Sequence, residues 1–395
     1  PAPPSVHSHA IRFIIALLLF IGVGALLLCL PFSHRAEGGN VPLTALFTAI
    51  SAGTVTGLSV VDTRDHWTTF GQIVILILVQ FGGLSFAVGA TLLLQIMRRG
   101  DNIGLRDELL MRDGSPALSL REAVTLSSRI IRYTIVAEII GTVLLTVRFA
   151  ADMPPGSALW AGLFHAVAAF CNGGFDLQGG LRSMTPYRDS VWINLIIIVL
   201  VQAGSIGFLA IDDLLTARRW TRLTLDSKLI LGLNAVLVLA GTLFFLAVEW
   251  HGALASTPAV YRPMTALFQS VSARSAGFTT IDWSQADPVT LFFWLGLMLV
   301  GGASGSTSGG VRLATIGVLL VAIVAAVRGA DDPQAFRRRL PLRIVGQALA
   351  IVAIFTMFHF IFSIALAVIE DGLGGEHLPF INLMFETMSA LATTG

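Results

Sequence analysis

A short pattern that ends in glycine occurs four times along the chain, at similar intervals. Each copy is a run of mostly small and apolar residues, followed by a few small or polar residues and then the glycine. The copies lie at residues 47–58, 164–175, 267–278 and 385–395, and without gaps they align Gly57, Gly174, Gly277 and Gly395. Because periodic self-similarity constrains architecture more strongly than local propensity, we expect four related structural units.

The composition indicates that these units lie in a membrane. Hydrophobic residues make up 55% of the 395 residues, charged residues make up 12%, and the mean hydropathy is +0.80. No soluble fold of this size is so apolar. Seven apolar runs are long enough to cross a hydrocarbon layer about 30 Å thick, at residues 11–31, 70–97, 123–148, 189–214, 229–249, 289–327 and 344–369. Shorter runs that lead into the glycine patterns are predicted to be re-entrant half-helices, at 41–52, 158–170, 262–273 and 379–390.

The predicted fold class is therefore an all-α membrane protein, in which four pseudo-symmetric helix–pore-loop–helix repeats surround a central pore. The repeats are predicted at residues 11–97, 123–214, 226–328 and 343–395, and the fourth is incomplete because the eighth span is missing. Non-helical backbone at membrane depth is tolerated only where it is buried in protein or lines a water-filled cavity. The glycine patterns are expected to meet that condition at the central axis.

Basic residues set the predicted orientation. The loops after the second, fourth and sixth apolar runs carry most of the arginines, so by the positive-inside rule they face the cytoplasm. We expect a multi-pass protein of the plasma (inner) membrane, with its amino terminus in the cytoplasm and its glycine patterns open to the outside. A formal net charge of +1 argues against a nucleic-acid partner. The sequence has no phosphate-binding loop, nucleophile motif or metal-ligand cluster, so an enzyme is not expected.

The glycine patterns predict an ion filter. Four such segments around one axis form a ring of backbone carbonyls, which is how a protein replaces the water shell of a cation. Glycine suits this ring because it reaches positive φ without steric cost. The alternative is that the glycines only terminate four helices. The residues predicted to face the ion, mainly through carbonyls, are Val55, Thr56, Gly57, Asn172, Gly173, Gly174, Ser275, Ala276, Gly277, Thr393, Thr394 and Gly395.

A second special segment interrupts the longest apolar run. Its glycine, serine and threonine residues do not sustain a continuous helix, and the small residues predict a weakly packed loop whose deletion leaves the filter untouched. A helix kink, or close helix packing through small residues, is the alternative. Arg312 is expected to tether the loop to a carboxylate, to repel cations, or to mark the cytoplasmic end of the helix. The residues concerned are Gly301, Gly302, Ala303, Ser304, Gly305, Ser306, Thr307, Ser308, Gly309, Gly310 and Arg312.

Charged residues near the glycine patterns suggest two further roles. Asp62, Asp176 and Asp282 follow their glycines closely and are predicted to line an outer vestibule that concentrates cations. Helix capping is an equally good explanation for them, especially for Asp282. Arg274 lies inside the third pattern, where a buried arginine needs a partner, and Glu386 is the candidate nearest in the sequence pattern.

These motifs resemble the Trk/Ktr/HKT superfamily of cation uptake proteins over nearly the whole chain. The four glycine patterns match, and the segment GGASGSTSGGVR is similar to the family's GGSAGSTAGGIK. The resemblance is strongest to KtrB-type membrane subunits, with the TrkH type as a second choice. It implies potassium uptake, because Gly57 stands where serine accompanies sodium selectivity in the family, and it implies that residues 301–310 are a gate.

The same resemblance implies partners. It predicts a homodimer in the lipid bilayer and a cytoplasmic ring of nucleotide-binding (RCK-type) regulatory subunits, with the K+ ion as the bound species and no organic cofactor in this chain. The alternative function is a sodium- or proton-coupled secondary cation transporter, which needs a site at the midplane between two half-bundles. The repeats are fourfold and parallel rather than inverted, which favours the pore.

Overall fold

The computed structural model describes residues 6–35, 41–84, 116–217, 219–329, 333–335, 338–372 and 378–395. Nearly all regular structure in these ranges is helical, and the strands among them are the two-residue pair β1 (Gln334–Ala335) and β2 (Arg338–Arg339). The expected all-α membrane fold is confirmed. The bounds of the four repeats stay a prediction.

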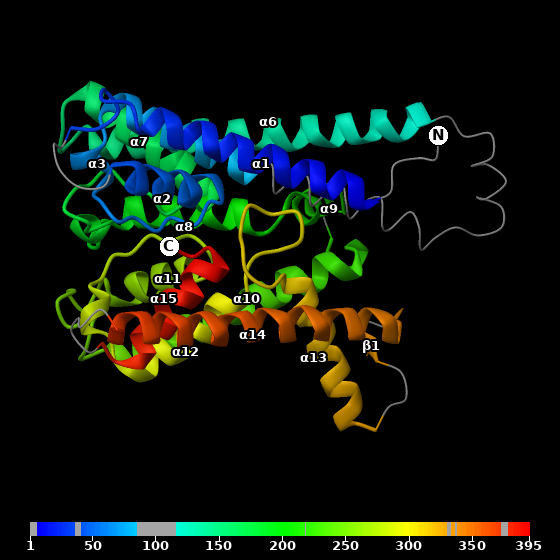
Figure 1. Cartoon of the computed structure of the whole chain (residues 1–395). Coiled ribbons are helices and arrows are strands. Elements are labelled where there is room, and N and C mark those ends of the chain that lie inside the picture. Colours follow the sequence, from blue (N-terminus) through cyan, green and yellow to red (C-terminus); the bar gives the residue numbers. More distant parts are fainter. Residues whose placement is uncertain are drawn as a thin grey trace.

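Long and short helices alternate along the chain. The long helices are α1 (Val6–Leu28), α6 (Pro116–Phe149), α10 (Leu225–Glu249) and α14 (Leu342–Gly372). Each packs against the short helix that follows it, and these short helices are α2 (Val41–Gly53), α7 (Pro155–Cys171), α11 (Arg262–Ser272) and α15 (Phe380–Ala392). The short helices are too short to span a bilayer, so they act as the half-helices that the apolar runs predict. In Figure 1 all four lie toward the end of the molecule that carries the short helix after α2.

A further helix follows each of the first three short helices. These are the helix Thr69–Leu84, then α8 (Val191–Ser205), which continues into α9 (Phe208–Ala217), and α12 (Pro288–Leu299), which is separated from α13 (Leu313–Val327) by a loop. Short elements in the connecting loops complete this part of the structure, namely α3 (Thr63–His66), η1 (Thr185–Tyr187) and η3 (Trp283–Gln285), with η2 (Trp220–Arg222) before α10.

One predicted span is not continuous. Residues 189–214 were expected to form a single helix, but α8 and α9 meet at an angle of 97°. The break falls at Ile206 and Gly207, where Gly207 has a φ of +83° that no helix accommodates. In the described part of the chain, three helices are long and apolar enough to cross a membrane alone, and the bent pair raises that number to four. Residues 85–97 of the second predicted span lie outside the described residues.

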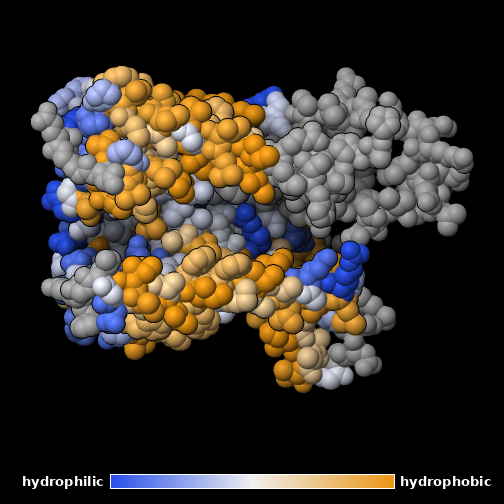
Figure 2. Space-filling view, in the orientation of Figure 1, coloured by the Kyte–Doolittle hydropathy of each residue, from blue (hydrophilic) through white to orange (hydrophobic). Residues whose placement is uncertain are grey.

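The surface has the polarity that a bilayer requires. Figure 2 shows a hydrophobic band over the outer faces of the helices and hydrophilic residues at the end that carries α3. Large apolar side chains of α14 are exposed along its length, among them Leu349, Phe358 and Val368. Lipid chains solvate such an apolar surface at no cost in free energy, whereas exposing it to water is unfavourable.

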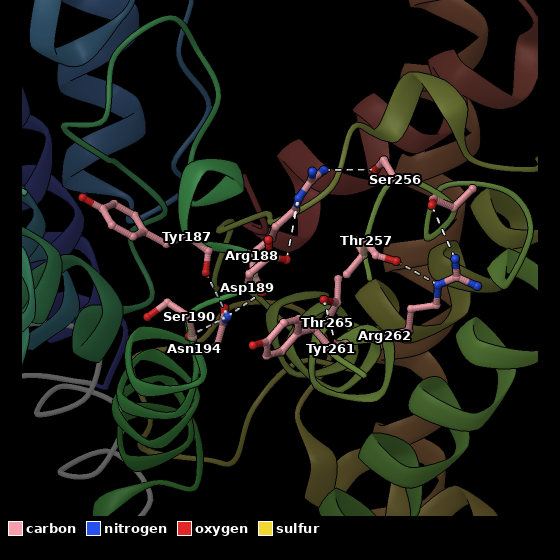
Figure 3. A network of polar contacts seen from close by, with 11 residues as sticks. Tyr187, Arg188, Asp189, Ser190, Asn194, Ser256, Thr257, Tyr261, Arg262 and Thr265 are labelled. Carbon is pink, nitrogen blue, oxygen red and sulfur yellow. Dashed lines mark hydrogen bonds and ion pairs between the residues drawn. The ribbon is translucent and has the colours of Figure 1, made fainter. Parts of the chain in front are cut away.

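A polar network holds the starts of α8 and α11 in place (Figure 3). Arg188 donates to the hydroxyl of Ser256, which joins the loop before α8 to the loop before α11. Arg262, the first residue of α11, donates to the carbonyls of Thr257 and Trp250, both at 2.9 Å. These bonds fix the start of α11, and thereby the place where its other end delivers the third glycine pattern.

Candidate ion pathway

Four glycines from distant parts of the chain meet in a closed ring. A Cβ built on Gly57 would lie 3.1 Å from the Cα of Gly174, and one built on Gly174 would lie 3.2 Å from the Cα of Gly277. The circle closes through Gly395, whose added Cβ would lie 3.1 Å from the Cα of Gly277 and 3.3 Å from that of Gly57. We call these four residues the glycine ring. Contacts this short leave little room for a side chain at any of the four positions.

The backbone before each ring glycine alternates in handedness. The ring glycines all have positive φ, at +86°, +65°, +75° and +94° in chain order. The residue two places earlier also has positive φ in every copy, although none of these residues is glycine: Val55 (+57°), Asn172 (+61°), Ser275 (+83°) and Thr393 (+51°). Such strained non-glycine residues persist only where the surrounding structure imposes them, and they cluster at functional sites. We call each three-residue stretch from this position to the glycine a glycine loop.

Backbone carbonyls lie close to the glycine ring. A Cβ built on Gly277 would lie 2.6 Å from the carbonyl oxygen of Thr394, and one on Gly395 would lie 2.8 Å from that of Thr56. At most two residues separate the end of each short helix from its glycine loop, so the negative ends of the helix dipoles also lie there. Both effects suit a cation.

The helix ends explain why the loops adopt this shape. In three copies the residue before the ring glycine donates its N–H to the carbonyl five residues back, from Thr56 to Ser51 at 2.7 Å, from Gly173 to Ala168 at 2.7 Å and from Thr394 to Ser389 at 2.8 Å. This is the Schellman ending of a helix, which needs a left-handed residue. In the third copy Ala276 bonds to the carbonyl of Ser272 instead, at 3.0 Å.

The segment 301–310 leaves the helical path between α12 and α13 and returns beside its own start. Gly301 donates to the carbonyl of Val311 at 2.9 Å, and Leu313 donates to that of Gly302 at 3.0 Å. The prediction of weak packing is wrong, because most of the segment is buried, including Ala303 and Ser306 with no exposed surface. Small residues here permit close approach, since a Cβ on Gly301 would overlap the carbonyl oxygen of Gly309.

The segment is also bonded to the bend between α8 and α9. Ala303 donates to the carbonyl of Ser205 at 2.9 Å, and Thr307 donates to that of Gly204 at 3.2 Å. The Oγ of Ser308 donates to the Oγ of Ser205 at 2.9 Å. The break in the α8–α9 span therefore supplies free backbone carbonyls, and the segment uses them.

Two glycine loops contact the segment directly. The side-chain amide of Asn172 donates to the hydroxyl of Thr307 at 2.6 Å and accepts from the hydroxyl of Ser205 at 3.2 Å. In the third loop, the hydroxyl of Ser275 accepts a hydrogen bond from the N–H of Gly309 at 2.8 Å. The segment and the glycine loops are therefore in direct contact, and the expectation that deleting the segment leaves ion preference unchanged stays a prediction.

Arg312 holds the segment from inside. Its guanidinium donates to the carbonyls of Ala303 and Ser308 and to the hydroxyl of Ser306. It bonds to the loop's own backbone, so the expected carboxylate tether is not observed among the described residues. The segment and Arg312 form one hydrogen-bonded unit.

Arg274 does not have the predicted partner. Its side chain is 1% exposed, and its three guanidinium nitrogens have no hydrogen-bond partner within the described ranges. Glu386 lies on an exposed part of α15 and forms no ion pair with Arg274. The sequence pattern failed here because alignment of repeats says which helix a residue belongs to, but not which way the side chain points around it.

The three acidic residues behave differently from one another. Asp62 caps α3, accepting from the N–H groups of Arg64 and Asp65 at 2.9 Å, and also accepts from Leu181. Asp282 caps η3 through the N–H of Ser284 at 3.0 Å. Asp176 is half-buried, and burial, with a smaller contribution from the negative charge of Asp62, raises its pKa to about 6. Capping is therefore observed for two of them, and the vestibule role stays a prediction.

Sequence reasoning missed the side-chain roles of Asn172 and Ser205. Both are buried and both contact the segment 301–310. The stretch LVQAGSIGF could have indicated the role of Ser205, because Gly204, Ser205 and Gly207 weaken a helix there. This stretch is the equivalent, in the second repeat, of the segment 301–310 in the third.

Short helices that bring four positive-φ glycines together around one point define a pore-loop membrane protein. A sequence profile of the family described as TrkH, cation transport protein, matches residues 18–395. Because the match covers most of the chain, the chain belongs to this family of cation transporters and not to a family of enzymes.

Characterised relatives agree with this assignment. The chain is 36% identical to the Ktr system potassium uptake protein B of Bacillus subtilis, over 100% of this chain and 85% of the relative. It is 34% identical to the protein of the same name from Vibrio alginolyticus, over 96% and 83%. It is 32% identical to the potassium/sodium uptake protein NtpJ of Enterococcus hirae, over 96% and 82%.

A solved structure supports the fold. The crystal structure of the potassium transporter TrkH from Vibrio parahaemolyticus matches with a TM-score of 0.67 and 20% sequence identity, over 97% of this chain and 82% of the other. At this identity the likeness concerns the arrangement of helices and not the ion.

Proposed function

We propose that this protein takes up potassium across the plasma membrane through a gated pore whose filter is the four glycine loops. The observation that carries the proposal is the closed glycine ring, in which the backbone alternates in handedness in all four copies. A ring of carbonyls at the dipole-negative ends of four helices replaces the hydration shell of a cation. The names of the relatives support potassium as that cation.

The ion preference is tested by flux into vesicles. The protein is reconstituted, and uptake of potassium, rubidium, sodium and lithium is measured under one gradient. Potassium and rubidium should exceed sodium and lithium, because all four ring positions are glycine and the carbonyl ring is undistorted. Equal potassium and sodium flux contradicts the proposed filter. Flux that requires a sodium or proton gradient supports a coupled transporter instead.

The segment 301–310 is the gate in this proposal. Its supporting observation is position, since it is hydrogen-bonded to the second and third glycine loops and to the α8–α9 bend. Ser304 borders an open pocket of about 600 Å³ that is also lined by α10, α13 and α14, and the segment withdraws toward this pocket in the proposal. Movement must break several hydrogen bonds together, so the gate is predicted to switch between two positions and not to drift.

The gate is tested by deleting residues 303–308 and by the isosteric change Thr307→Val. Deletion should raise potassium flux strongly, and Thr307→Val should raise it less, because it removes only the bonds to Asn172 and to the carbonyl of Phe170. Thr290→Val is the matched control: Thr290 is a buried threonine of α12 whose hydroxyl has no partner within the described residues. A folded deletion variant with parental flux refutes the gate.

Asp62, Asp176 and Asp282 form the outer vestibule in this proposal, and they raise the local concentration of cations before the filter. Two of them also cap short helices. A carboxylate that accepts N–H bonds keeps its charge, so capping and attraction of cations are compatible.

A homodimer and a cytoplasmic nucleotide-binding ring complete the proposal. The family resemblance and the basic inner loops support the ring. Changing Arg337, Arg338 and Arg339 together to glutamate should weaken co-purification with that ring and reduce the response to nucleotide. If assembly and response both persist, these arginines serve only to orient the chain in the membrane.

A further inference from the structure

The hydroxyl of Ser275 lies between the segment 301–310 and the fourth glycine loop. Its oxygen accepts from the N–H of Gly309 at 2.8 Å, and its proton goes to the carbonyl oxygen of Thr393, also at 2.8 Å. The hydroxyl of Thr393 lies 3.3 Å away. Ser275 is 1% exposed, so water does not compete for these positions. One side chain thus joins the segment to a backbone carbonyl of another glycine loop.

The contact at Gly309 is too close to be incidental. A Cβ on Gly309 would overlap the Oγ1 of Thr393, and it would lie 2.6 Å from the carbonyl oxygen of Ala392. Only glycine brings an N–H group this near to Ser275. The segment is therefore shaped to place a donor at this point.

The hydrogen-bond donors and acceptors around Ser275 determine how many oxygen lone pairs are free to bind a cation there. A serine hydroxyl has one proton and two lone pairs. With the segment in place, a lone pair of Ser275 is directed to Gly309, and the Thr393 carbonyl faces an O–H donor. A cation needs oxygen lone pairs that no proton occupies, and a nearby N–H or O–H dipole repels it. This end of the glycine loops therefore offers a cation fewer free oxygens while the segment is seated.

We propose that the Ser275 hydroxyl is a ligand of the cation position that lies at the start of the glycine loops, next to the segment 301–310, when that segment is withdrawn. When the segment is seated, the hydrogen bond from Gly309 occupies the hydroxyl oxygen. A bound cation at this position and a seated segment therefore exclude each other. On withdrawal Gly309 leaves, the hydroxyl rotates, and both the Ser275 oxygen and the Thr393 carbonyl turn lone pairs to the ion. The inference rests on the proposed filter and gate. Because such coupling is reciprocal, potassium at this position also favours the withdrawn segment.

The test is a cycle of equilibrium potassium binding on the full-length protein in detergent, measured by titration with potassium chloride. The variants are the parent, a deletion of residues 303–309, which also removes the Gly309 donor, Ser275→Ala, and the two changes combined. In the serine background the deletion should tighten potassium binding by about fivefold, the effect of roughly one hydrogen bond. In the Ser275→Ala background the deletion should change binding less than twofold, since the shared ligand is gone.

A matched control separates this link from general filter damage. Ser389 also donates its hydroxyl to a glycine-loop carbonyl, that of Gly395 at 3.0 Å, but from α15. In the Ser389→Ala background the fivefold effect should persist. If Ser275→Ala does not fold, Ser275→Gly removes the hydroxyl and relieves the strain of the +83° φ.

The outcomes distinguish the inference from the gate. If the deletion raises flux in vesicles but tightens potassium binding equally with Ser275 and with Ser275→Ala, the gate stands and the link is refuted. If the deletion leaves flux unchanged, the gate itself fails. A deletion effect on binding that disappears in both the Ser275→Ala and the Ser389→Ala backgrounds also overturns the link, because it then reflects the filter as a whole.

Discussion

Gly277→Ala is expected to remove most ion discrimination, because Gly277 has the least space in the glycine ring. A Cβ there would lie 2.6 Å from the carbonyl oxygen of Thr394 and 2.9 Å from the Cα of Gly174. Ordinary contact begins at 3.4 Å, so the Thr394 carbonyl must retreat by about 0.8 Å unless the third loop moves instead. Alanine at a φ of +75° costs a further 1–2 kcal/mol or so.

A retreat of this size acts on selectivity more than on folding. A filter discriminates between ions through the number and spacing of its carbonyls. A loss of ~1.4 kcal/mol in the preference for potassium over sodium is about tenfold in the flux ratio, and displacing one of the carbonyls at this level is expected to cost at least that. The assay is the ratio of potassium to sodium uptake in vesicles, with unfolding temperature measured alongside.

Alanine substitutions at two other glycines serve as comparisons for Gly277→Ala. Gly296→Ala in α12 is the neutral control, because no atom lies within 4 Å of its added Cβ. Gly174→Ala should be the mildest ring substitution, since its nearest contact is 3.2 Å. An unchanged flux ratio in folded Gly277→Ala protein, or a larger loss at Gly174 than at Gly277, refutes the steric argument.

Two further outcomes are expected. Because the pKa of Asp176 is raised to about 6 by burial, its carboxyl is neutral below that pH and charged above it, so uptake from dilute potassium should fall as outside pH drops through about 6, and Asp176→Asn should flatten this profile. The raised pKa also means that the folded state favours the neutral carboxyl. The contribution of Asp176 to the free energy of unfolding is therefore lost as pH rises through about 6. Arg274→Met should leave the unfolding temperature unchanged or higher, because a buried charge that no described residue pairs with destabilises, and a marked fall would reveal a partner.

The helical layout could be predicted because hydrophobic run length and repetition depend only on the order of residues. The half-helices and the ring glycines follow from those two signals. The bend at Gly207 was signalled only by the low helix propensity of Gly204, Ser205 and Gly207, and such a run is also compatible with a straight helix until a neighbour needs its carbonyls. The close packing of Ser306 and its neighbours was unpredictable for a related reason, since small residues permit either mobility or intimate contact.

Arg274, which has no hydrogen-bond partner in the part of the chain that the structure describes, shows a different limit. The burial of Arg274 could be expected because it lies three residues before a ring glycine. Predicting its partner required knowing how two side chains are oriented around separate helices. Repeat alignment carries no such information. The tie between Asn172 and Thr307 was equally hidden, because it joins residues 135 positions apart.

The left-handed position at the start of each glycine loop has an evolutionary consequence. Packing of the four loops around the ring imposes the positive φ in all four copies, whichever residue stands there. The side chain at this position can therefore differ from copy to copy. Val55 lies in the apolar core, whereas Asn172 and Ser275 contact the segment 301–310. A fourfold ancestor could therefore specialise one quarter at a time, dividing support and control among the copies while the main-chain scaffold for the ion stayed the same.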